Sequence, residues 1–403
     1  MKTVAIIAEY NPFHTGHEYQ INRIREEFGH DTRIIAIMSG NYTQRGSIAI
    51  MDKSTRAECA VRCGANLVLE LPFPFSLSSA EFFAKSGVYI ASSLGVVDIL
   101  SFGSELGDIT KLELIAANIK SKRYQDKLSE LINISNNKNV GYPALCEKAY
   151  KSLFGENITS DFFTSNNILA IEYIKALLSF GSNIKAHTIK RIGAEYSENK
   201  ITGESHQSAS AIRNLMQTNF NSAIEYIPND AKNTVISAYT NKHMPCVEDK
   251  LSSAVISHFR LNSPAAQIHD ADGGLYNRLQ NASFEASSIS KLTEIADTKK
   301  YTSSRIRRAI WYSFFSVTSS EVKELPRYTQ VLAMDSVGKS ILKDVKKKTD
   351  FPVITKPSSY EFLSETAKRQ KELSDKADSV FQLTKPEAPH GNISLKTSPF
   401  VLD

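Results

Sequence analysis

Short apolar runs alternate with amphipathic stretches along the first hundred residues of the chain. The apolar runs predict strands over residues 4–8, 33–38, 67–71 and 96–102. The amphipathic stretches between them predict helices over residues 16–28, 52–64 and 79–94, with Asp52 and Ser79 as caps of the last two. Strands that are apolar throughout and alternate with helices predict a parallel sheet covered on both faces.

The rest of the chain predicts mostly helices. Residues 108–180 favour helices, residues 184–189 one more strand, and a further helix opens at residue 208. From about residue 230 strand patterns become few, and the last thirty residues are polar and proline-containing, which favours loose structure. We therefore expect a Rossmann-like α/β domain over residues 1–225, followed by a mainly α-helical region with a polar tail over residues 226–403.

The composition is that of a soluble globular protein, with 41% hydrophobic and 23% charged residues among 403. No apolar stretch approaches the roughly 18 to 20 residues that cross a bilayer. The apolar amino terminus is short and ends at Glu9, so we expect a first strand and not a signal peptide. These features predict a cytoplasmic protein that does not contact a membrane.

The four cysteines do not form a disulfide framework in a chain of this length. Cys59 and Cys63 lie four apart on a predicted helix, but no further metal ligands of suitable spacing stand nearby. We expect reduced, packed thiols and no metal held by the protein. The net charge of +5 permits a nucleic-acid partner without requiring one.

The strongest chemical signal is the segment Asn11-Pro12-Phe13-His14-Thr15-Gly16-His17, which follows the first strand and opens a helix. His14 and His17 are three residues apart, so both can face one ligand, and Gly16 lets a phosphate approach the backbone. The helix amino terminus adds free N–H groups and a positive dipole end. This arrangement predicts a site for the α-phosphate of ATP, with both imidazoles as hydrogen-bond donors in the transition state. The alternative is a helix cap with two surface histidines.

A second phosphate site is predicted at the helix that opens with Ser208-Ala209-Ser210-Ala211-Ile212-Arg213. Small hydroxyl residues at a helix start, followed by an arginine, can cradle a phosphate. On its own the segment is equally consistent with a helix cap and a solvated arginine. Together with the histidine motif, it leads us to expect Ser208, Ser210 and Arg213 on the other side of a triphosphate site.

These two motifs in one strand–helix domain resemble the nucleotidyltransferase superfamily. A narrower resemblance, to the bacterial tRNA(Met) cytidine acetate ligase family, is carried by further segments and is densest before residue 215. They are Glu9–His17, Met38-Ser39-Gly40, Gln44-Arg45-Gly46, Leu69-Glu70-Leu71-Pro72, Phe102-Gly103-Ser104-Glu105, Ser165-Asn166-Asn167-Ile168-Leu169, Arg191-Ile192 and the helix start at Ser208. Thr15 departs from the asparagine frequent in related sequences, and Ala211 replaces a possible third hydroxyl.

The resemblance implies a nucleotidyltransferase fold for residues 1–225 and an AMP-forming ligase activity. Such enzymes activate acetate with ATP, release pyrophosphate, and transfer the acetyl group to N4 of the wobble cytidine of elongator tRNA(Met). The resemblance implies His14 and His17 as catalytic residues. It implies ATP contacts at Ile7, Ala8, Glu9, Tyr10, Asn11, Pro12, Phe13, His14, Thr15, Gly16, His17, Gln20, Gly103, Asn166 and Arg191. Mg²⁺ is expected to arrive with ATP, and no protein partner is implied.

Basic residues in the helical region suggest where tRNA contacts the protein. Arg305, Arg307 and Arg308 open a helix that continues into aromatic residues, and Lys346 and Lys347 belong to a second cluster. We expect both clusters to follow RNA phosphates, although a solvated face with a buried aromatic core is the alternative.

Two other functions remain open from the residues alone. One is an adenylyltransferase that acts on a small phosphate ester, and the other is a non-catalytic RNA-binding protein that holds ATP as a structural ligand. The large basic helical region argues against the first. The histidine pair argues against the second, because mere binding does not require transition-state donors.

Overall fold

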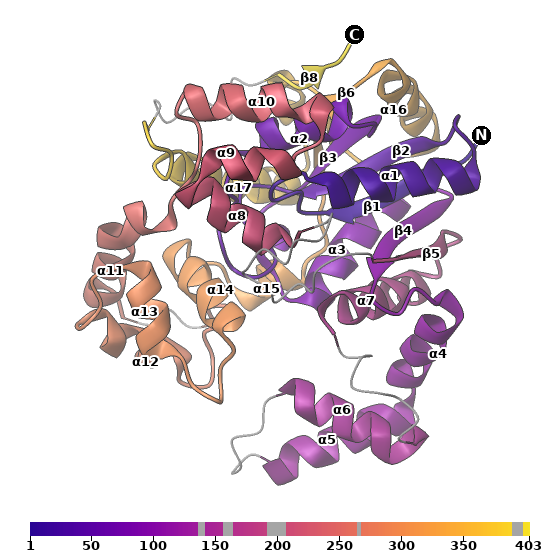
Figure 1. Ribbon diagram of the computed structural model, residues 1–403. Helices are drawn as coiled ribbons and strands as arrows, with labels where there is room; N and C mark the ends of the chain where they lie inside the picture. The colour runs from indigo at the N-terminus through magenta and orange to yellow at the C-terminus, as the bar shows by residue number, and fades with distance from the viewer. Residues whose placement is uncertain (136–141, 156–163, 192–206, 264–266, 389–397) are drawn as a thin grey trace.

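The computed structural model describes residues 1–135, 142–155, 164–191, 207–263, 267–388 and 398–403, and a twisted sheet of eight strands lies at its centre (Figure 1). The strand order is β5-β4-β1-β2-β3-β6-β7, with β8 beside β6. The strands are β1 (Thr3–Ala8), β2 (Arg33–Ser39), β3 (Leu67–Leu71), β4 (Ile99–Ser104), β5 (Lys185–Lys190), β6 (Thr329–Met334), β7 (Val353–Ile354) and β8 (Phe400–Val401). The first five are parallel, and β6 pairs antiparallel with β3.

Helices account for most of the remaining chain. They are α1 (Thr15–Phe28), α2 (Lys53–Arg62), α3 (Ala80–Ser93), α4 (Ile109–Lys120), α5 (Lys122–Ser135), α6 (Tyr142–Phe154), α7 (Ser165–Phe180), α8 (Ala209–Thr218), α9 (Phe220–Ala223), α10 (Asn229–Thr240), α11 (Ser252–Leu261), α12 (Leu275–Ser283), α13 (Ile289–Ala296), α14 (Ser303–Phe314), α15 (Ser319–Lys323), α16 (Ser336–Lys348) and α17 (Glu365–Gln382). Short 3₁₀ turns span Phe75–Leu77, Ile224–Tyr226, Glu248–Leu251 and Pro357–Phe362. Across the described ranges, no helix has both the length and the apolar character needed to cross a membrane.

Both faces of the sheet are covered, as the apolar strands predict. Alternate residues of β2 point to opposite faces, so Ile35 and Ile37 pack with α3, α4, α7 and α16, while Ile34 and Ala36 pack with α1, α2, α8 and α10. The predicted helices and strands of the first 104 residues are confirmed. The fourth strand begins at Ile99 and not at residue 96. Residues 96–98 form the turn before it, where the Asp98 carboxylate accepts a hydrogen bond from Thr3 N at 2.7 Å.

Residues 226–403 are mainly helical, but they do not form a separate unit. The chain returns to the sheet at β6, which pairs with β3, so the expected domain boundary at residue 225 does not separate a sheet domain from a helical domain. A third apolar core joins α11–α14 to Ala377 and Phe381 of α17, and to Tyr42 and Phe73 from the loops after β2 and β3. The helical part therefore packs against the carboxyl edge of the parallel strands, where ligands bind in such sheets.

The expectation of a loose polar tail is wrong where the structure describes the chain. Helix α17 runs to Gln382, and its Asp378 is 2% exposed. Lys53 Nζ lies 2.7 Å from Glu70 Oε1 and 2.5 Å from Asp378 Oδ2, and Asn41 Nδ2 donates to Asp378 Oδ1 at 2.8 Å. This buried charge cluster ties α17 to the loops at the carboxyl edge. Residues 389–397 of the expected tail lie outside the described residues.

Candidate active site

A cavity of about 490 Å³ opens at the carboxyl ends of β1 and β4. Five helices begin at its wall and contribute a residue at or next to their first position: His14 of α1, Ala80 of α3, Ser165 of α7, Ala209 of α8 and Thr302 of α14. Helix amino termini carry N–H groups that have no partner within the helix, and each terminus is the positive end of the helix dipole. Their convergence suits a ligand with several negative charges.

The two histidines of the predicted motif lie side by side at the start of α1. Their ring centroids are 3.9 Å apart. Gly16 N donates to His14 Nδ1 at 3.0 Å, and His14 N donates to His17 Nδ1 at 3.3 Å, which completes a capping box. Because each Nδ1 accepts a backbone proton, we assign the proton of each neutral ring to Nε2. Each imidazole thus offers one Nε2–H donor.

His17 is held in the neutral form. Loss of hydration in the cavity wall, followed by the nearby His14 and Arg191, holds the pKa of His17 well below its ordinary value of 6.5. A neutral imidazole with its proton on Nε2 donates a hydrogen bond at neutral pH. The alternative of a helix cap is correct for His14, but neither histidine is a fully exposed surface residue.

Close packing explains why glycine occupies positions 16 and 103, and the sequence alone did not reveal this. A Cβ on Gly16 would lie 2.8 Å from His14 Cε1, so the glycine lets the His14 ring fold over the helix start. A Cβ on Gly103 would lie 3.2 Å from Arg191 Cγ, so this glycine admits the arginine beside β4. Both glycines therefore position a charged or polar side chain. Ile192, the other residue of the Arg191 motif, lies outside the described residues.

Most of the predicted ATP contacts are brought together. Those that line the cavity are Ile7, Ala8, Glu9, Tyr10, Asn11, His14, His17, Gln20, Gly103, Asn166 and Arg191. Gly16 lines an adjoining hollow of about 50 Å³ together with His17 and Arg191.

The remaining predicted contacts do not line either space. Phe13 is fully buried and its ring packs against Tyr10, with centroids 4.9 Å apart. Pro12 is buried beside it, and Thr15 is the first residue of α1. Ser208 caps α8 by accepting from Ala211 N at 3.1 Å. Side-chain contact of these residues with ATP is therefore not what the geometry supports.

The second predicted phosphate site acts through the loop after β1. Arg213 donates to Asn11 O at 2.8 Å and to Ser210 Oγ at 2.9 Å. Its guanidinium is thus engaged with the protein, and Ala209 is the α8 residue that lines the cavity. Ser208, Ser210 and Arg213 do not line the cavity, so their direct contact with a phosphate stays a prediction, and the bonds of Arg213 fix the segment around Asn11.

Glu105 fixes the start of α7 and the side chain of Asn166. Its carboxylate accepts from Asn166 Nδ2 at 2.6 Å, from Thr164 Oγ1 at 2.8 Å and from Asn167 N at 2.8 Å. Burial acts to raise the pKa of Glu105, but the hydrogen bonds from Asn166 and Thr164 outweigh it and hold this pKa below its ordinary value. With its amide nitrogen bound to Glu105, Asn166 offers Oδ1 as an acceptor.

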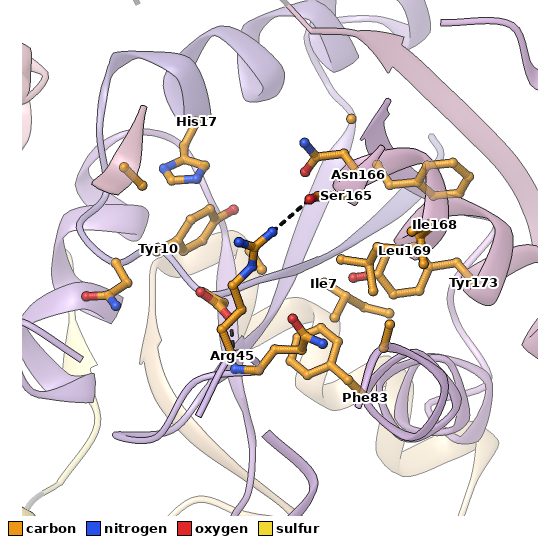
Figure 2. A pocket seen from close by; sticks show the side chains of 18 of the residues that line it. Ile7, Tyr10, His17, Arg45, Phe83, Ser165, Asn166, Ile168, Leu169 and Tyr173 are labelled. Carbon is orange, nitrogen blue, oxygen red and sulfur yellow. Dashed lines mark hydrogen bonds between the residues drawn. The ribbon is translucent and has the colours of Figure 1, made fainter. Parts of the chain in front are cut away.

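Several lining residues were not predicted as ligands. They are Gln44, Arg45, Ala80, Phe83, Phe102, Ser165, Ile168, Leu169, Tyr173, Ala209, Thr302 and Ser304. Arg45 NH2 donates to Ser165 Oγ at 2.8 Å, which links the loop after β2 to α7 (Figure 2). The glycine-bearing turn at the end of β2 could have indicated Arg45. No pattern in the sequence indicates Thr302 or Ser304, which come from the helical part.

Helix α14 reaches the cavity because Gly46 lets it approach closely. Gly46 has φ +82°, and a Cβ there would lie 2.6 Å from Arg307 Cβ and 2.7 Å from Arg308 N. We expect Gly46→Ala to combine a strained backbone, worth about 1–3 kcal/mol, with a clash against the backbone of α14. The measurement is urea unfolding, with Gly181→Ala as the control, since Gly181 has φ +57° and nothing within 4 Å. Equal losses of stability in the two variants would show that α14 does not pack tightly against Gly46.

The predicted RNA-binding arginines differ in accessibility. Arg308 is 8% exposed and pairs with Asp270 at 2.6 Å, so its prediction as a phosphate ligand is wrong. Arg305 pairs with Asp272, while Arg307 is exposed. The aromatic residues that follow, Trp311 and Tyr312, are fully buried and do not offer a surface for stacking on a base.

The predicted lysine cluster lies at the opposite edge of the sheet from the cavity. Lys346 and Lys347 are exposed at the end of α16. A Cβ on Gly95, in the turn before β4, would lie 3.1 Å from Lys348 Cβ, and Asp344 pairs with Arg33 at the start of β2 (2.6 Å). Both contacts are at the amino ends of the parallel strands.

Comparison with known proteins identifies the family of the chain. A family model described as HIGH Nucleotidyl Transferase matches residues 1–394. The tRNA(Met) cytidine acetate ligase of Thermoanaerobacter sp. (strain X514) is 36% identical over 379 residues, which cover 93% of this chain and 93% of that protein. The chain belongs to the tRNA(Met) cytidine acetate ligase family. A second relative of that name, from Acetivibrio thermocellus, is 34% identical, and the match covers 89% of this chain and 89% of that protein.

Solved structures show the same fold for the tRNA(Met) cytidine acetate ligase family. The crystal structure of Thermotoga maritima TmcAL in apo form I is 32% identical, covers 100% of both chains and has a TM-score of 0.93. The structure of the same protein bound with alpha-thio ATP is 31% identical, with full coverage of both chains and a TM-score of 0.91. The predicted Rossmann-like nucleotidyltransferase fold is thus confirmed, and the chain is an enzyme of the ligase class.

Proposed function

We propose that this chain activates acetate with ATP and transfers the acetyl group to N4 of the wobble cytidine of elongator tRNA(Met). In the first step a carboxylate oxygen of acetate bonds to the α-phosphorus, and the bond from that phosphorus to the bridging oxygen of pyrophosphate breaks. In the second step the cytidine nitrogen attacks the acetyl carbon, loses its proton, and AMP leaves. An enzyme that modifies tRNA must share a compartment with it, so we also propose that the protein is cytoplasmic.

The observation that carries the proposal is the pair of imidazoles that each accept a backbone proton at Nδ1, in a cavity on which five helix amino termini converge, and we assign their Nε2–H groups as the donors. Negative charge on the α-phosphate oxygens grows as pyrophosphate leaves, and fixed donors lower the free energy of that transition state. His14 and His17 are the proposed catalytic residues. The names of the relatives and the alpha-thio ATP bound by the Thermotoga maritima protein support ATP as the ligand and tRNA(Met) as the acceptor.

The proposed ATP contacts are the predicted residues that line the cavity, except Ile7, which lies on the side opposite to His17. Arg191 brings a positive charge beside Gly103, and Asn166 offers an acceptor at the start of α7. Mg²⁺ accompanies ATP in this proposal and keeps most of its water. Glu9 carries a carboxylate to the cavity, and Gln44 N donates to its Oε1 at 2.9 Å.

One experiment separates the proposal from its two alternatives. The protein is incubated with ATP, labelled acetate and tRNA, without coenzyme A. Label on tRNA together with AMP supports the acetate ligase. Pyrophosphate release that needs a phosphate ester and no acetate would favour the small-molecule adenylyltransferase. Retention of tRNA with neither reaction would favour the RNA-binding protein.

We predict that Arg307→Ala weakens tRNA binding. Arg307 is exposed near the start of α14, the helix whose Thr302 and Ser304 line the cavity, so we propose that it contacts RNA held at the cavity. Loss of one phosphate contact should reduce the slope of log K against log salt by about 1. The measurement is tRNA binding over a series of salt concentrations.

Lys347→Ala serves as the comparison for Arg307→Ala, because it removes one exposed positive charge at the opposite edge of the sheet. If Lys346 and Lys347 contact tRNA as the sequence predicts, Lys347→Ala lowers the slope as well, and the RNA covers both edges. An unchanged slope in Arg307→Ala would remove Arg307 from the proposed tRNA surface.

A further inference from the structure

The side of the cavity away from His17 has an apolar wall. Ile7, Phe83 and Phe102 line it and are 7%, 1% and 4% exposed, and Leu169 of α7 packs beside them. Figure 2 shows Ile7, Phe83 and Leu169 on the side of the cavity opposite to His17. Such a wall offers nothing to a phosphate or a ribose, so it calls for an apolar part of a ligand.

Tyr173 adds one polar atom to this wall. The side chain is 2% exposed, its ring lies 5.5 Å from that of Phe102, and its hydroxyl finds no hydrogen-bond partner among the described residues. Burial, together with the negative charge of Glu9, raises the pKa of Tyr173 far above its ordinary value, so the hydroxyl keeps its proton. Folded proteins rarely leave a buried donor unpaired, and a ligand oxygen in the cavity would pair with this one.

Arg45 supplies a positive charge at the border between the apolar wall and the histidine side. Its guanidinium donates to Ser165 Oγ at 2.8 Å, and Figure 2 shows its side chain extending between His17 and the apolar residues. A guanidinium has five N–H donors, so it can bind Ser165 and a carboxylate at the same time.

We propose that Tyr173, Arg45 and the wall of Ile7, Phe83 and Phe102 form the subsite that binds the acid substrate, a small aliphatic carboxylate. The inference rests on the proposed function and names the residues that select its acid. A carboxylate only accepts hydrogen bonds, so it matches a phenol and a guanidinium, and its short alkyl group matches the wall. An adenine ring matches less well, because it can offer only single ring nitrogens as acceptors and carries a donor amino group beside two of them, whereas a carboxylate offers two oxygens that only accept.

Tyr173→Phe tests the polar half of the subsite. The expected result is a rise in the KM for acetate of about tenfold or more, with the KM for ATP within about twofold of wild type. Both constants come from acetate-dependent exchange of pyrophosphate into ATP. Tyr312→Phe is the matched control, because Tyr312 is also buried with an unpartnered hydroxyl but does not line the cavity. It should leave both constants unchanged.

Phe83→Ala tests the apolar half. Enlarging the wall should raise kcat/KM for propionate and butyrate, relative to acetate, by about tenfold or more. Thermal unfolding of each variant confirms that it is folded before its kinetics are read.

A higher KM for ATP but not for acetate in Tyr173→Phe would overturn the proposal and would assign the apolar wall to the adenine base of ATP. An unchanged KM for acetate in that variant, or unchanged acid selectivity in Phe83→Ala, would overturn it too.

The wild type distinguishes failure of the subsite from failure of the proposed function. If the wild type exchanges pyrophosphate without any acid, or never does so with acetate, the ligase proposal fails and the subsite falls with it. If the wild type depends on acetate and Tyr173→Phe behaves like Tyr312→Phe, the subsite alone fails.

Discussion

Replacing His17 by alanine is expected to lower the rate of acetate-dependent pyrophosphate release by about 10²- to 10³-fold. The variant loses one fixed Nε2–H donor at the place where charge develops on the α-phosphate. The KM for ATP should change much less, because the donor acts mainly in the transition state. Rates are measured by pyrophosphate release under saturating ATP and acetate. His30→Ala, which removes an exposed imidazole, is the control and should be as active as wild type.

His14→Ala should show a comparable loss of rate together with a loss of stability. His14 caps α1 through the bond from Gly16 N, and losing such a cap costs about 1 kcal/mol. A His17→Ala variant with wild-type turnover would exclude His17 from the chemistry and would favour the reading of the pair as a helix cap.

The pH dependence follows from the direction of the pKa shift. Because the pKa of His17 is lowered in the folded protein, the ring stays neutral from pH 8 down to well below 6.5, and the rate should not fall near pH 6.5 through this residue. Unfolding raises the pKa of His17, so the unfolded state binds the extra proton. The stability contributed by the neutral ring is therefore full above pH 6.5 and declines as the pH falls below it.

The local half of the site could be predicted from sequence, because its residues are close in the chain. The strand β1, the turn and α1 are contiguous, so apolar pattern and helix-start chemistry were sufficient to find His14 and His17. The bond between Arg45 and Ser165 joins residues 120 positions apart, and α14 reaches the cavity from beyond residue 300. Such contacts depend on packing of the whole chain, for which a single sequence has no local signal.

Strand β6 and Arg308 illustrate two further limits. The run Thr329–Met334 is short and lies between helices, and its antiparallel pairing with β3 breaks the strand–helix alternation that revealed the other strands. Arg308 has the same residue type as Arg307 and is next to it, yet one is buried against Asp270 and the other is exposed. On a helix, neighbouring residues point in directions about 100° apart, so charge clusters in sequence need not be clusters in space.

Lys53→Met is expected to destabilise the protein by about 3–5 kcal/mol, the largest effect on stability that we predict. Lys53 is 8% exposed and is the cation between Glu70 and Asp378, which are 1% and 2% exposed. Methionine has a similar volume but leaves two buried carboxylates without their partner. Urea unfolding at pH 7 measures the loss. Lys127→Met is the control, because Lys127 pairs with Glu130 at 2.9 Å on the surface and should contribute less than about 1 kcal/mol.

Acid should rescue part of the stability that Lys53→Met loses. Burial already raises the pKa of Glu70 in the folded wild type against the lowering effect of Lys53, so loss of the ammonium raises this pKa further above its unfolded value. A carboxyl group with a raised folded pKa favours the folded state most below its unfolded pKa, and this advantage disappears as the pH rises through the folded value. The gap in stability between wild type and variant should therefore be smaller at pH 5 than at pH 8. A gap that does not change with pH would mean that the two carboxylates find other partners, and that α17 does not depend on this cation for its place at the carboxyl edge of the sheet.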